Sequence, residues 1–196
     1  ITPNFFNLST VWNIIVQSTP VLLVAMGMTF VIAIAGIDIS VGSTMALCAT
    51  AATLLMSHGQ PVWVCVLAGL GIGLASGIIT GVLAIKLKIQ PMVLTLAMMI
   101  ILRSVARIIC DVRSVQVTND GFIAASLTKF GDVPIQLIYV AAIVLLFYVI
   151  AEYTVFGKSI EAIGNNSTAA ELSGIHSNRI AILAYVILGI LAAIAA

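Results

Sequence analysis

Long apolar runs alternate with short polar stretches along the whole chain. The runs cover residues 8–35, 41–56, 62–85, 91–109, 135–151 and 180–196. A helix needs about 20 apolar residues to cross a bilayer core. None of the runs shows the two-residue alternation of a half-buried strand. The pattern therefore predicts an all-α fold, a polytopic transmembrane helical bundle with one membrane segment for each run.

Two prolines interrupt the apolar pattern in different ways. Pro20 lies inside the first run, where it removes a backbone donor. It predicts either one kinked span or an interfacial helix followed by a short span. Pro91 instead follows a polar turn, and proline suits the first turn of a helix. We expect a helix from Pro91 to about Ile109.

The run at 62–85 carries a glycine at every fourth position. These glycines are Gly69, Gly73, Gly77 and Gly81. Residues four apart share a helix face, and small residues there allow a neighbouring helix to approach closely. A phosphate-binding loop is excluded because no strand precedes the glycines and no Lys-Ser/Thr pair follows. We expect this face to pack against another helix of the same bundle.

Composition supports a membrane protein and restricts its chemistry. Apolar residues make up 62% of the chain, charged residues 8%, and mean hydropathy is +1.24. A net charge of +1 gives no basic patch for nucleic acid. Residues 1–196 form a single domain, and the first residue is Ile1 while the last residues stop inside an apolar run. We therefore expect truncation at both ends.

The few charges predict the orientation of the loops. Lys86 and Lys88 form a short cationic loop, which the positive-inside rule assigns to the cytoplasm. The polar island at 152–178 falls on the same side by parity and carries Lys158. Residues 110–134 then lie on the opposite side. Their mixed charges suit either a docking surface for a soluble protein or a plain solvated loop.

The polar island contains a short helix with its own start and stop signals. Thr168 and Glu171 have the spacing of a capping box, and Gly174 suits a left-handed stop. A helix this short has little stability alone, because nucleation is costly and few hydrogen bonds follow. We expect a partner protein to hold it. The alternative is a solvated loop with turn glycines.

Several enzyme and carrier chemistries are absent from the sequence. The two histidines lie in separate loops, and no nucleophile–base pair or metal cluster is apparent. Gly157-Lys158-Ser159 lacks the upstream glycine and strand of a nucleotide-binding loop. We expect no catalytic residue, no metal and no cofactor. A proton-coupled carrier usually has several buried ionisable groups, whereas only Asp38 and an arginine pair qualify here.

Three separated stretches resemble one family. Residues 35–43 resemble the Gly-Gly-Ile-Asp-Leu-Ser-Val-Gly-Ser signature of sugar permeases, altered at Ala35 and Ile39. Residues 90–103 resemble a second signature, in which a Thr-Leu segment ends in an arginine. The island resembles the cytoplasmic coupling loop of ABC importers. The chain is thus similar to bacterial sugar-uptake ABC permeases of the ribose and galactofuranose type, within the branched-chain permease superfamily.

The resemblance implies function, partners and site residues. It implies a translocation subunit for a monosaccharide in the bacterial cytoplasmic (inner) membrane, with a second permease subunit as a homodimer, cytoplasmic ATPase subunits and a periplasmic sugar-binding protein. The implied ATPase-coupling residues are Glu161, Ala162, Gly164, Asn166, Thr168, Ala169, Ala170, Glu171 and Gly174. The pathway or structural candidates are Gly36, Asp38, Ser40, Gly42, Ser43, Thr95 and Arg103.

The residues alone leave the role of Asp38 and the exact branch of the family open. Asp38 can cap a helix end, pair with Arg103, contact the sugar or lie exposed at the membrane surface. The flanking Gly36 and Gly42 permit a helix break there, and Ser40 or Ser43 can cap the next helix. The chain can also belong to the branched-chain amino acid or nucleoside branch, or be a secondary transporter.

Overall fold

The structure is a computed structural model that describes residues 8–113, 117, 120–130 and 133–196. Its elements are α1 (Leu8–Ala33), α2 (Val41–Ser57), α3 (Val62–Lys86), α4 (Pro91–Ile109), α5 (Asp120–Leu127), β1 (Lys129–Phe130), β2 (Val133–Pro134), α6 (Ile135–Tyr153), α7 (Val155–Asn165), α8 (Ser167–Leu172) and α9 (Ser177–Ala195). The predicted all-α class is confirmed. The only strands in the described ranges are β1 and β2, which pair antiparallel.

Five of the described helices are long and apolar enough to cross a membrane. They are α1, α3, α4, α6 and α9. The apolar helix α2 is shorter, at 17 residues. It is shorter because residues 34–40, called the connector below, are not helical. Pro20 lies inside α1, which runs unbroken from Leu8 to Ala33. The interpretation with a separate interfacial helix is therefore wrong.

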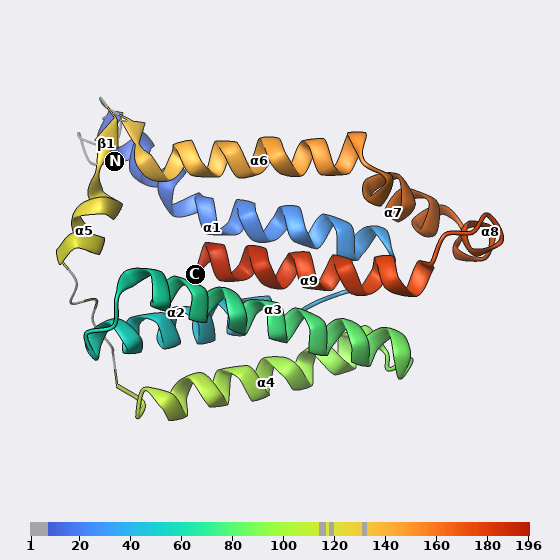
Figure 1. Ribbon diagram of the computed structural model, residues 1–196, viewed down its shortest axis with the longest axis horizontal. Helices are drawn as coiled ribbons and strands as arrows, with labels where there is room; N and C mark the ends of the chain where they lie inside the picture. The colour runs from blue at the N-terminus through green and yellow to red at the C-terminus, as the bar shows by residue number, and fades with distance from the viewer. Residues whose placement is uncertain (1–7, 114–116, 118–119, 131–132) are drawn as a thin grey trace, which may run out of the picture.

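The long helices lie side by side, and α9 occupies the centre of the bundle (Figure 1). It packs against α3 and α1, while α2 lies against α3 and α4. The helix α6 lies at the edge of the bundle, where Val140 is its one buried residue. Large apolar side chains face outward on most helices, as expected where lipid or another membrane subunit replaces water.

The two ends of the bundle differ in what they carry. Figure 1 shows the turn between α3 and α4 at the same end as α7 and α8, with α5 and β1 at the opposite end. Lys86 and Lys88 therefore share an end with the polar island. The described part of residues 110–134 lies at the other end, as the loop charges predict.

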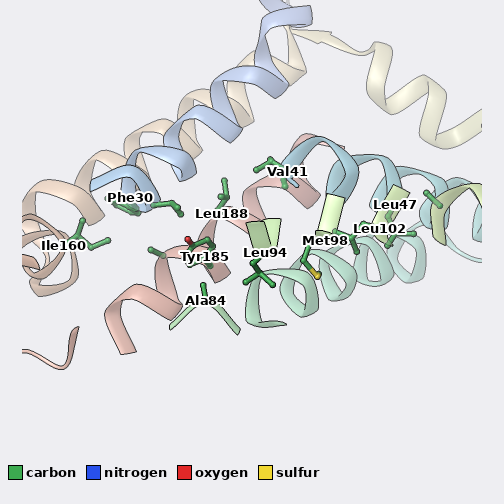
Figure 2. Close-up of a cluster of buried hydrophobic side chains, with 14 residues drawn as sticks. Phe30, Val41, Leu47, Ala84, Leu94, Met98, Leu102, Ile160, Tyr185 and Leu188 are labelled. Carbon is green, nitrogen blue, oxygen red and sulfur yellow. The ribbon is translucent and has the colours of Figure 1, made fainter. Parts of the chain in front are cut away.

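The largest buried cluster joins α1, α2, α3, α4, α7 and α9 (Figure 2). Tyr185 and Leu188 of α9 lie near its middle, each 1% exposed, and Phe30 of α1 is 4% exposed. Val31 and Val41 of this cluster flank the connector, in which Gly36, Asp38 and Ser40 are buried while Ala35, Ile37 and Ile39 are exposed. The break between α1 and α2 therefore has one buried side and one exposed side.

Candidate translocation core and coupling element

The Asp38 side chain sits at the start of α2. Its Oδ1 accepts hydrogen bonds from the Ser40 backbone N–H at 2.8 Å and from Ser40 Oγ at 2.6 Å. Ser40 is the N-cap residue, and its carbonyl accepts from the amides of Ser43 and Thr44. A carboxylate at this position also interacts favourably with the positive end of the helix dipole. This geometry matches the predicted role of Asp38 at a helix end.

Exposure of Asp38 and its pairing with Arg103 do not fit the structure. Asp38 is 8% exposed, so it does not lie open at a membrane surface. Arg103 is exposed on α4 and takes part in none of the ion pairs among the described residues. The predicted Asp38–Arg103 pair is therefore wrong. The hydrogen-bond partner of Asp38 is Ser40, two residues along the chain, and not a residue of α4.

A small polar cavity adjoins Asp38. Its volume is about 10 Å³, and Ser40, Thr44, Ser76 and Thr80 contribute hydroxyl groups to its lining. This volume holds about one water molecule. A sugar does not fit in this conformation, so contact between Asp38 and sugar stays a prediction that requires the bundle to open.

Thr95 of α4 and Tyr185 of α9 contact the connector from two sides. Thr95 is fully buried on α4, and its Oγ1 lies 3.5 Å from the Ile37 carbonyl oxygen and 3.3 Å from that of Met92. A Cβ on Gly36 would lie 2.6 Å from the Tyr185 hydroxyl oxygen. Gly36 is thus required for close approach to α9. Gly42 has open space around it, and nothing in the structure explains a glycine there.

The left-handed residue of the connector is Ala35 rather than a glycine. Its φ is +59°, a region that L-residues other than glycine rarely adopt. The family signature has glycine at this position. The helix break predicted between Gly36 and Gly42 is present, but neither glycine has a positive φ.

The glycine face of α3 packs on the backbone of α9. A Cβ on Gly77 would lie 2.6 Å from the Tyr185 carbonyl oxygen, and one on Gly73 would overlap the Gly189 carbonyl. Gly81 lies against Tyr185 and Ile182, whereas Gly69 faces Cys48 of α2. The prediction that this face packs inside the bundle is confirmed.

The polar island forms two helices instead of one. In α7, Ile160 and Ile163 are buried. Lys158 and Glu161 are exposed and form an ion pair, with 3.7 Å between Lys158 Nζ and Glu161 Oε2. In α8, Ala170 is buried and Leu172 is 86% exposed. The exposed residues from the predicted coupling set are Glu161, Gly164, Asn166, Thr168, Ala169, Glu171 and Gly174, with Ala162 half-buried. This short helix pair presents an exposed surface at the end of the bundle.

The predicted capping box of α8 is wrong. Asn166 is the N-cap, and its Oδ1 accepts from the Ala169 N–H at 3.0 Å. Thr168 lies inside the first turn, because the asparagine two residues earlier already satisfies a free amide. Gly174 has a φ of +84°, so the predicted left-handed stop is confirmed.

The sequence suggests Gly164 as a residue that turns the chain before the short helix, and this interpretation is wrong. Gly164 lies inside α7 with an ordinary helical backbone, so it does not turn the chain. It packs directly on the Ala33 carbonyl oxygen at the end of α1, where a Cβ would overlap that atom. Close approach between helices explains this glycine.

Sequence reasoning missed two residues of the core. Tyr185 and Gly189 of α9 lie opposite the α3 glycines, and the buried Tyr185 hydroxyl lies against Gly36 of the connector. A polar aromatic and a glycine four residues apart in an apolar run were the available signal.

The long apolar helices and the exposed polar helix pair define a multi-pass membrane protein. The chain belongs to the family described as branched-chain amino acid transport system / permease component, whose model matches residues 10–196. The family resemblance stated from the three motifs is confirmed. No solved structure matches the chain significantly.

Curated relatives of this chain are named as sugar permeases. A fructose import permease protein of Bifidobacterium longum is 38% identical over 91% of this chain and 51% of its own length. A ribose import permease protein of Escherichia coli is 35% identical over all of this chain and 62% of its own length. A galactofuranose transporter permease protein of Escherichia coli is 36% identical over 93% of this chain and 54% of its own length. The chain thus spans about half to three fifths of these relatives.

Proposed function

We propose that this chain is part of the translocating subunit of an ATP-driven importer for a monosaccharide. The observation that carries the proposal is the exposed α7–α8 pair at the end of the bundle that also bears Lys86 and Lys88. The names of the relatives support a sugar as the cargo. The family description gives branched-chain amino acids as the second candidate cargo.

The proposal includes the partners and the orientation. The end with α7 and α8 faces the cytoplasm of a bacterial inner membrane, because cations favour that side. There, α8 enters a groove of an ATPase subunit, which carries out the hydrolysis. A second permease subunit completes the pathway, and a periplasmic binding protein delivers sugar at the opposite end.

Physical features of α8 suit this docking role. Six residues form too short a helix for independent stability, so a partner surface adds to what the Asn166 cap provides. Leu172 exposes 86% of its surface to water in the isolated chain, and burying a leucine side chain yields about 2 kcal/mol. The small side chain of Ala169 lets the partner approach the helix closely.

Co-purification of the full-length permease with its ATPase subunits tests this assignment. Leu172→Asp introduces a charge into the proposed groove, so we expect loss of the ATPase from the complex. Val112→Asp is the matched control, because Val112 is 80% exposed and follows α4, whose C-terminal end lies opposite to α8 (Figure 1). Equal ATPase recovery with both variants would contradict docking through α8.

Reconstitution in liposomes tests the transport function itself. We expect sugar uptake that requires ATP inside and the binding protein outside. Uptake driven by an ion gradient alone would instead indicate a secondary transporter. Titrating the binding protein with a panel of monosaccharides and branched-chain amino acids decides the class of cargo.

A further inference from the structure

The helix α7 packs against the last turns of α1 through a ring contact and a backbone contact. The rings of Phe156 and Phe30 meet edge to face, with centroids 5.3 Å apart. One face of Gly164 lies on the Ala33 carbonyl oxygen, backbone against backbone. These four residues are called the α1–α7 joint below. Such contacts are stiff, because packed interfaces switch between arrangements and do not deform continuously.

The joint lies immediately before the connector. After Ala33 the chain leaves the helix, with the Ala35 N–H bonded to Ile32 at 2.9 Å and the Gly36 N–H bonded to Val31 at 2.8 Å. Asp38 and the N-cap residue Ser40 then lead into α2, which begins at Val41. A few non-helical residues can absorb changes in φ and ψ that a helix cannot. The connector is therefore the soft segment next to a stiff contact.

Movement of α7 and α8 could also enter the bundle through α6 and α9, which α7 contacts as well. The helix α6 lies at the edge of the bundle, and the route through α9 is more rigid. The helix α8 also leads to α9, but α9 is held against α3 by backbone contacts at Gly73, Gly77 and Gly189. Moving α9 relative to α3 would separate these backbones along several turns. A displacement of α7 and α8 is resisted there and meets less resistance at the connector.

We propose that the α1–α7 joint passes movement of the coupling element to the connector, with Phe156 and Gly164 as positioning residues. This inference rests on the proposed function. When the ATPases displace α7, the end of α1 moves with it, and the connector changes its contacts with Tyr185 and Thr95. The start of α2 and the polar cavity beside Asp38 then change shape.

The experiment measures thiol labelling in the connector separately from ATPase binding and hydrolysis. The reporter is Ile37→Cys, because Ile37 lies in the connector and is 48% exposed. It is introduced into a full-length permease whose own cysteines are replaced by alanine. We compare the rate of thiol labelling with and without ATP in the assembled transporter. In the parent we expect ATP to change the rate by about fivefold or more, in the range of ordinary allosteric couplings.

Variants of the joint should remove this response while leaving the ATPase bound. Gly164→Ala pushes α7 away from Ala33, and Phe156→Ala removes the ring contact. In Phe156→Ala, which lies outside the predicted coupling set, we expect ATPase recovery and hydrolysis to persist. In both variants we expect the labelling response to vanish and the sugar moved per ATP to fall. Phe156→Tyr keeps the ring and should restore the response. Gly71→Ala is the control, because Gly71 has open space around it.

The outcomes separate the two proposals. An undiminished labelling response in both joint variants overturns the joint as the route. A parent with bound ATPase but no response at Ile37 also overturns it. Failure of the parent to bind ATPase at all overturns the proposed function together with this inference.

Discussion

Adding a side chain at Gly77 should force α3 and α9 apart. A Cβ at Gly77 would lie 2.6 Å from the Tyr185 carbonyl oxygen and 2.9 Å from Val186 Cα. Carbon atoms in normal contact stay about 3.5–4.0 Å from their neighbours, so the backbones must separate by about 1 Å. Both atoms belong to backbone and cannot rotate away.

The expected cost follows from overpacking. Insertion of this kind destabilises a packed core by about 1–3 kcal/mol. For a chain of this size, each kcal/mol lowers the melting temperature by about 2–4 °C. We therefore expect Gly77→Ala to lower the melting temperature in detergent by about 2–12 °C, and Gly77→Leu to lower it further. Gly71→Leu, on an open face of the same helix, should have little effect.

A double-mutant cycle provides a second measurement. Gly73 and Gly189 occupy the same contact, with each Cβ overlapping the other residue's carbonyl oxygen. Once one alanine has separated the helices, the second should cost less, giving a coupling of about 0.5–3 kcal/mol. Additive effects, or Gly73 and Gly77 leucine variants as stable as Gly71→Leu, would refute the proposed α3–α9 contact.

Three further predictions concern the connector and the orientation. Ala35→Gly should be neutral to slightly stabilising, because relief of about 1–2 kcal/mol of left-handed strain offsets a smaller entropy cost. Ala35→Val should destabilise the protein, and the melting temperatures of both variants test this. Asp38→Asn retains an acceptor for the Ser40 amide and should melt near the parent, whereas Asp38→Leu should lose about 1–3 kcal/mol of stability in denaturant titrations. Single cysteines at Lys88 and Val112 should be labelled from opposite sides of the membrane in intact cells, and labelling of both from outside would contradict the topology.

Local sequence pattern was sufficient for the long apolar helices and the family. Apolar runs of span length predicted an all-α bundle, since a chain in lipid must satisfy its backbone hydrogen bonds within each segment. Glycine spacing likewise predicted the packing face of α3, because residues four apart share a helix face whatever lies opposite. The stop at Gly174 was also predictable, because a helix stop signal acts within a few residues.

Only the tertiary structure decided what those faces meet. Gly164 reads as a turn residue in sequence, but it exists to let α7 touch Ala33, which is more than a hundred positions away. Asn166 and Thr168 are both possible N-caps for α8. Asn166 takes this position because α7 ends at Asn165 and α8 follows directly. Tyr185, Gly36 and Thr95 meet at the connector through packing of α9 and α4 around it. Such contacts depend on the assembled bundle, since helix periodicity specifies a face and not its partner.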